Sequence, residues 1–167
     1  MFDVAADLDG RGLRVAVIAS RFNPDLSQRL VAGAERQLET LRCDRVEVHW
    51  VPGAFEIPLG AQALAASGRY DALVALGTVI RGGTPHFDYV CRAVTDGVRE
   101  VNLRSGVPVA FGVLTTENRE QALARAAEPG ESGSNKGGEA AAVAVEMACF
   151  VRNLVRASEP ERAAAER

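Results

Sequence analysis

At residues 72–88 the chain reads ALVALGTVIRGGTPHFD, an apolar strand that runs into a glycine-rich loop and then into the start of a helix. Glycines in such a loop let backbone N–H groups approach an anion closely. His86 follows the loop directly, and an imidazole carries protons near neutral pH. The pattern indicates a ligand site at the end of this strand, although an ordinary strand-to-helix turn capped by a threonine explains it equally well.

Strand and helix patterns alternate on both sides of this stretch. Continuous apolar runs predict buried strands at residues 13–19, 72–76 and 107–114, and alternation predicts an edge strand at 45–51. Helices are expected at residues 24–41, 56–66, 87–103, 117–126 and 137–155. Four strands, each followed by helical sequence, predict an α/β fold with a four-stranded parallel sheet covered on both faces.

The domain organisation expected from this pattern is simple. Residues 13–156 form a single domain, since 167 residues suffice for one core. Residues 1–12 form an N-terminal extension that is available to extend a sheet, including that of a neighbouring subunit. Residues 157–167 form a polar C-terminal tail that we expect to fray.

Composition favours small molecules as ligands. The formal net charge is −3 and no basic face is evident, which argues against nucleic acid. No apolar run is long enough to span a membrane, and the first residues lack the pattern of a signal peptide. The cysteines Cys43, Cys91 and Cys149 are far apart and form no C-x-x-C pair, so we expect no disulfide, no zinc and a cytoplasmic location.

Chemically useful side chains follow the predicted strands. Ligands in such folds gather at the carboxyl ends of the strands, where this chain places an aromatic ring, a carboxylate, free amides and a histidine. These candidates are Phe22, Asn23, Ala54, Phe55, Glu56, Thr78, Val79, Ile80, Gly83, Thr84 and His86. The set suits a planar, polar small molecule together with an anion. The glycine loop matches neither the Walker A pattern nor G-x-G-x-x-G, which disfavours nucleotides bound in those ways.

Each candidate also has a plainer explanation. Phe22 could pack under the first helix, as lone aromatic side chains usually do. Glu56 could be a first-turn acid that favours the helix dipole. Arg125 and Lys136 could be solvated charges.

The combination of motifs is more specific than its parts. The chain carries SRFN at 20–23, VPGAFEIP at 51–58, ALGTVIRGGTPH at 75–86 and FGVLTTEN at 111–118, followed by NKG from Asn135. In order and in spacing it resembles the 6,7-dimethyl-8-ribityllumazine synthase family over residues 13–155. The resemblance implies a flavodoxin-like three-layer α/β/α sandwich and the penultimate step of riboflavin biosynthesis. That step condenses 5-amino-6-(D-ribitylamino)uracil with 3,4-dihydroxy-2-butanone 4-phosphate, without a metal or an organic cofactor.

The resemblance also implies residue roles. Those implied for ribitylaminouracil are Phe22, Asn23, Ala54, Phe55, Glu56, Thr78, Val79, Ile80, Phe111 and Lys136. Phe22 would stack on the pyrimidine and Glu56 would hold the ribityl hydroxyls. Gly83, Thr84 and Arg125 would bind the phosphate of the second substrate.

His86 is the residue implied for proton transfer. Family members assemble as homopentamers, and some join twelve pentamers into a shell. Phe111, Arg125 and Lys136 would face the site of an adjacent subunit. The segment 125–136 is a few residues longer than the commonest family version and lacks the intervening lysine usually seen there. Longer loops at this place accompany isolated pentamers in the family, so the resemblance implies a pentamer, or two pentamers face to face, and no shell.

Other functions fit parts of the same pattern. A related condensing enzyme that makes riboflavin from two lumazines differs only in its substrates. A non-catalytic flavin or lumazine carrier would keep the pocket, but it would need neither His86 nor Arg125. A flavin electron carrier would need aromatic residues flanking the flavin ring, and no such pair is evident.

Overall fold

A computed structural model describes residues 5–165, with only the backbone for residues 156–165. Within that range one parallel sheet has the strand order β2-β1-β3-β4. Its strands are β1 (Arg14–Ser20), β2 (Arg45–Val51), β3 (Ala72–Ile80) and β4 (Val109–Thr116). β2 lies at an edge of the sheet, as its alternating pattern predicts.

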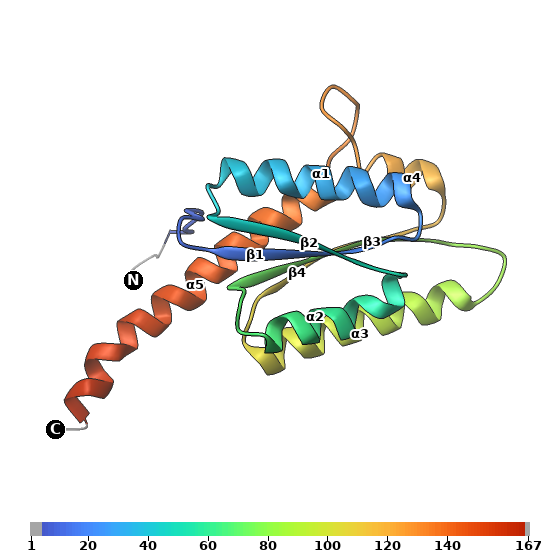
Figure 1. Cartoon of the computed structure of the whole chain (residues 1–167). Helices are drawn as coiled ribbons and strands as arrows, with labels where there is room; N and C mark the ends of the chain where they lie inside the picture. The colour runs from blue at the N-terminus through green and yellow to red at the C-terminus, as the bar shows by residue number, and fades with distance from the viewer. Residues whose placement is uncertain (1–4, 166–167) are drawn as a thin grey trace.

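Helices form a layer on each face of the sheet (Figure 1). One layer holds α1 (Pro24–Thr40), α4 (Arg119–Leu123) and α5 (Lys136–Ala165). The other holds the 3-10 turn η1 (Ala54–Glu56), α2 (Ile57–Ala66) and α3 (His86–Ser105). The strand order and the layers confirm the predicted α/β class and the flavodoxin-like sandwich.

The core is divided by the sheet into two clusters. Val15 and Val17 of β1 pack under α1 and α5, whereas Ala16 and Ile18 face α2 and α3. All four side chains are almost fully buried. A strand with both faces buried requires a continuous apolar run, which explains why this segment shows no alternation.

Two strands reach further toward their carboxyl ends than the sequence predicts. β3 continues to Ile80 instead of ending at Leu76, and β4 spans Val109–Thr116 instead of 107–114. The extra length is stabilised by pairing, because β3 and β4 stay in register up to Ile80 opposite Thr116. The last residues of β3 therefore belong to a strand.

The helix predicted at 117–126 is too long, since α4 spans only five residues. The chain leaves the helix because Ala126 forms an antiparallel bridge with Asn135 and the Lys136 N–H donates to the Arg125 carbonyl at 2.8 Å. α5 continues to Ala165, beyond the predicted end at residue 155. Alanine, glutamate and arginine are good helix formers, so polar composition alone does not end the helix there.

Residues 1–4 of the predicted N-terminal extension lie outside the described residues. The remainder forms no strand in the described structure and packs on its own chain. The Gly10 N–H donates to the Leu41 carbonyl at 2.8 Å, and the Cys149 thiol donates to the Asp9 carbonyl at 3.4 Å. Pairing of this extension with a neighbouring subunit remains a prediction. None of the described helices combines the length and the apolarity needed to cross a membrane.

Candidate active site

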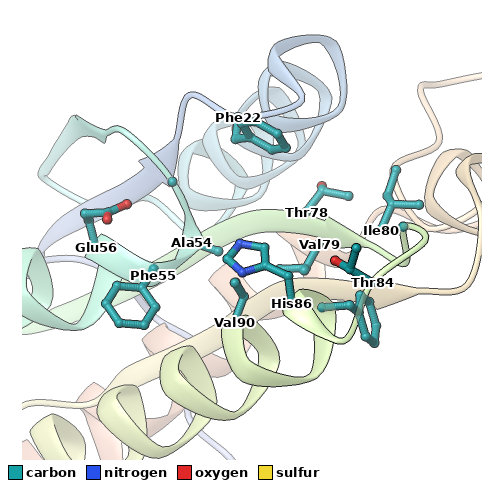
Figure 2. Close-up of a pocket in the computed structure, with 13 residues that line it drawn as sticks. Phe22, Ala54, Phe55, Glu56, Thr78, Val79, Ile80, Thr84, His86 and Val90 are labelled. Atoms are coloured by element: carbon teal, nitrogen blue, oxygen red, sulfur yellow. The ribbon is translucent and has the colours of Figure 1, made fainter.

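A pocket lies where the strand order reverses, between β1 and β3. Open α/β sheets bind ligands at the carboxyl ends of strands at such a point. The pocket has a volume of about 630 Å³, and we call it the strand-end pocket (Figure 2). It is lined by Phe22, Gly53, Ala54, Phe55, Glu56, Thr78, Val79, Ile80, Gly82, Thr84, His86, Phe87 and Val90.

Phe22 forms an aromatic wall of this pocket. Its side chain is 68% exposed, so the explanation that it packs under α1 is wrong. The turn that carries it is held from two sides. The buried Ser27 hydroxyl donates to the Phe22 carbonyl at 3.1 Å, and the Asn23 amide donates to the Thr78 carbonyl at 3.1 Å. Asn23 therefore braces the turn and does not line the pocket.

Glu56 brings the carboxylate to the pocket from the end of η1. A Cβ atom placed on Gly53 would lie 3.0 Å from the Glu56 Oε2 atom, so the carboxylate folds back over the preceding loop. Phe55 beside it is 60% exposed. This turn offers a ligand a carboxylate acceptor and an aromatic surface. Glu56 also lies directly before α2, so its effect on the helix dipole is compatible with a binding role.

The end of β3 presents backbone groups to the pocket. β1 pairs with β3 only as far as Leu76, so residues 77–80 have no strand partner on that side. On that side, the Thr78 carbonyl accepts a hydrogen bond from the Asn23 side-chain amide. The Thr78 hydroxyl is buried, and it has no hydrogen-bond partner within the described part of the chain. A ligand edge can therefore meet polar groups at this strand end.

The glycine loop leaves its amides free. Within residues 5–155 no hydrogen bond is made by Gly82, Gly83 or Thr84, and all three are exposed. Only Pro85 separates them from α3, whose N-terminus favours an anion. The imidazole of His86 points into the pocket (Figure 2) and has no hydrogen-bond or ion-pair partner among the described residues. Nor do any three His, Cys, Asp or Glu side chains of those residues form a metal-binding group.

A second pocket of about 360 Å³ lies along β4, and we call it the β4-edge pocket. It is lined by Phe111, Gly112, Val113, Leu114, Thr115, Arg125, Lys136, Glu139, Ala140 and Val143. Backbone pairing holds Arg125 beside Lys136, and the Lys136 ammonium contacts Glu139 at 2.7 Å. It shares no lining residue with the strand-end pocket.

The structure therefore brings together most, but not all, of the predicted residues. Nine line the strand-end pocket: Phe22, Ala54, Phe55, Glu56, Thr78, Val79, Ile80, Thr84 and His86. Gly83 lies between two lining residues without lining the pocket itself, while Phe111, Arg125 and Lys136 gather in the β4-edge pocket. Gly53 and Gly82 lie in the predicted strand-end stretches without a predicted binding role, and the sequence prediction missed Phe87 and Val90. Val90 could have been found, since it lies one helical turn after His86.

Comparison with known protein families identifies a family whose sequence pattern this chain matches. A sequence model of the family described as 6,7-dimethyl-8-ribityllumazine synthase matches residues 12–152. That range includes every residue that lines either pocket.

Proposed function

The chain belongs to the 6,7-dimethyl-8-ribityllumazine synthase family, and we propose that it catalyses the condensation of 5-amino-6-(D-ribitylamino)uracil with 3,4-dihydroxy-2-butanone 4-phosphate. The products are the lumazine, inorganic phosphate and water. The observation that carries the proposal is the strand-end pocket, in which Phe22, Glu56 and His86 surround one cavity of suitable size.

The ribitylaminouracil binds across the strand end. An exposed ring such as Phe22 can stack on a flat heteroaromatic base. The unpaired side of β3 at Thr78, Val79 and Ile80 supplies backbone groups for the uracil edge. The Glu56 carboxylate accepts hydrogen bonds from the ribityl hydroxyls, assisted by the backbone beside it.

The butanone phosphate binds at the glycine loop. Free amides at Gly83 and Thr84, one proline before the start of α3, suit a phosphate. The amine of the first substrate attacks the ketone, water leaves, and phosphate is eliminated afterwards. Each stage moves a proton, and the unpaired imidazole of His86 can donate and accept it. Holding the two substrates together supplies much of the remaining acceleration.

The complete site requires two subunits in this proposal. Arg125, which suits the phosphate, and Lys136, which suits a carbonyl of the uracil, lie in a pocket separate from His86. A head-to-tail contact that sets the β4-edge pocket of one subunit against the strand-end pocket of the next would join them, and repetition of this contact closes a ring. We propose a homopentamer, alone or paired face to face. The three free thiols fit a reducing, cytoplasmic location.

A direct assay tests the activity. Purified protein is mixed with both substrates in the absence of metal, and lumazine absorbance is followed against the uncatalysed background. Acceleration that requires the phosphate substrate is expected. No acceleration, together with tight binding of riboflavin or lumazine, would instead identify a non-catalytic carrier.

Mixing two impaired variants, assayed with the butanone phosphate well below its KM, tests the shared site. His86→Ala and Arg125→Ala damage different pockets, so subunits co-assembled in equal amounts should restore about a quarter of the sites. The matched control is co-assembly of His86→Ala with Glu56→Ala, which both damage the strand-end pocket and should restore none. Equal recovery in the two mixtures would contradict a site built from both pockets.

A further inference from the structure

Arg81 joins three elements behind the strand-end pocket. Its backbone N–H donates to the Thr116 carbonyl at 2.9 Å, next to the last pair of β3 with β4. Its guanidinium donates to Glu117 at 2.7 Å and to both oxygens of Asp88 at 3.1 and 3.3 Å. The same group lies 4.1 Å from the ring centroid of Phe87.

The loop that follows Arg81 has little else to hold it. A Cβ atom placed on Gly82 or Gly83 would meet no heavy atom within 4 Å. No hydrogen bond fixes residues 82–84 within the described structure. The loop is therefore restrained at its two ends, by Arg81 and by the first turn of α3. Arg81 contacts that turn directly through Phe87 and Asp88.

We propose that Arg81 is a positioning residue, which holds the glycine loop and His86 in place by clamping Phe87 and Asp88 against Glu117. This inference rests on the proposed function, since it concerns the phosphate loop of that site. Arg81 does not line the strand-end pocket, whereas Phe87 does, so its effect passes through Phe87 and Asp88.

The chemistry of arginine suits this position. A planar guanidinium can pair with two carboxylates through its edges while its face lies on an aromatic ring, and a lysine ammonium cannot do both. Hydrogen bonds to Asp88 and Glu117 raise the pKa of Arg81. Both carboxylates are well exposed, so each ion pair alone contributes little to stability. The two ion pairs and the stacking on Phe87 together hold the loop in position.

Steady-state kinetics of Arg81→Gln test the proposal. Because small misplacement of reacting groups is costly, kcat should fall about tenfold and the KM for the butanone phosphate should rise about tenfold. The KM for ribitylaminouracil should stay at the wild-type value. The kcat and KM values of Arg81→Lys should lie between those of the wild type and Arg81→Gln, since lysine keeps the positive charge but lacks the planar, bidentate guanidinium. Glu117→Gln removes one of the two carboxylates that Arg81 contacts, so it should change kcat and the KM for the butanone phosphate in the same direction but less. This variant provides the test if Arg81→Gln does not fold.

Arg69→Gln is the matched control. Arg69 also lies over an aromatic ring, 5.0 Å from the centroid of Tyr70, and contacts a carboxylate, Glu47, at 3.9 Å. It precedes the opposite, amino end of β3, so its kinetics should match the wild type. An equal change in Arg69→Gln and Arg81→Gln, or an equal rise of both KM values, would overturn the inference.

A measurement without turnover separates this inference from the proposed activity. Backbone order parameters from NMR should fall at Gly82 and Gly83 in Arg81→Gln and not in Arg69→Gln. If the wild-type protein has no synthase activity, the proposed function fails and the order parameters still decide whether Arg81 holds the loop. Order parameters at Gly82 and Gly83 that are unchanged in Arg81→Gln would contradict the inference that Arg81 holds the loop.

Discussion

The strand-end pocket and the β4-edge pocket differ in both chemistry and construction. The strand-end pocket is the larger, at about 630 Å³ against about 360 Å³, and among the described residues that line it only Glu56 and His86 have titratable side chains. The β4-edge pocket concentrates charge in Arg125, Lys136 and Glu139. One pocket offers a stacking surface and a proton carrier, whereas the other offers cations.

Different devices hold the two pockets in shape. The strand-end pocket follows from strand register, with Asn23 bonded to the end of β3. The β4-edge pocket depends on one side chain in a loop. The Asn135 amide donates to the carbonyls of Arg29 and Ala127, and its oxygen accepts from the first amides of α5. The difference teaches that the cations and the imidazole are held in separate pockets of one chain, and in the proposed homopentamer contact between subunits would bring them together.

The largest expected effect belongs to the strand-end pocket. His86→Ala should lower kcat about 100-fold, because general acid–base catalysis contributes at least that much. Both KM values should change little, since the imidazole does not hold either substrate. Steady-state kinetics in both substrates checks this. Wild-type kcat in His86→Ala would remove the main chemical distinction between the two pockets.

Arg125→Ala should show the opposite pattern. A hydrogen bond to a charged group contributes about 1.5–3 kcal/mol, so the KM for the butanone phosphate should rise about tenfold or more. The KM for ribitylaminouracil should be nearly unaffected. Initial rates with one substrate held saturating separate the two values. An equal loss for both substrates would contradict a phosphate role for the β4-edge pocket.

Phe22→Ala should weaken binding without weakening the fold. Aromatic stacking is worth about 0.5–1.5 kcal/mol, so the KM for ribitylaminouracil should rise several-fold. The free energy of unfolding should barely change, because the ring is mostly exposed. Leu30→Ala is the matched contrast, since this fully buried side chain should cost about 2–5 kcal/mol. Urea titration of both variants tests this, and a large stability loss in Phe22→Ala would show that its ring packs as core.

The smallest effect concerns the loop beside the β4-edge pocket. The Glu128 backbone N–H and the Arg29 guanidinium lower the pKa of Glu131 below its ordinary 4.5. Glu131 therefore contributes stability above pH 4.5 that is lost as the pH falls through its lower folded pKa. An NMR titration of the Glu131 carboxyl should show that depressed pKa, and Arg29→Gln should move it back toward 4.5. Titration at 4.5 or above in the wild-type protein would contradict a loop held by this contact.

The sequence predicted the strand-end pocket better than the β4-edge pocket, for a physical reason. Phe22, Glu56 and His86 each follow a strand of the predicted parallel sheet, and parallel strands necessarily bring their carboxyl ends to one edge. The grouping of Arg125 with Lys136 came only from the resemblance. That grouping depends on an antiparallel bridge between Ala126 and Asn135, which no periodic pattern in the sequence predicts.

By itself, the sequence determined the α/β class, the edge position of β2 and most of the residues around the strand-end pocket, because burial imposes a period on every strand and helix. Only the tertiary structure decided where β3 and β4 end, that Asn23 braces a turn, and that Arg81 reaches both Asp88 and Glu117. These features depend on hydrogen bonds between segments far apart in the chain. Such contacts exist only after the sheet has brought its strands into register, and local patterns in the sequence cannot encode their geometry.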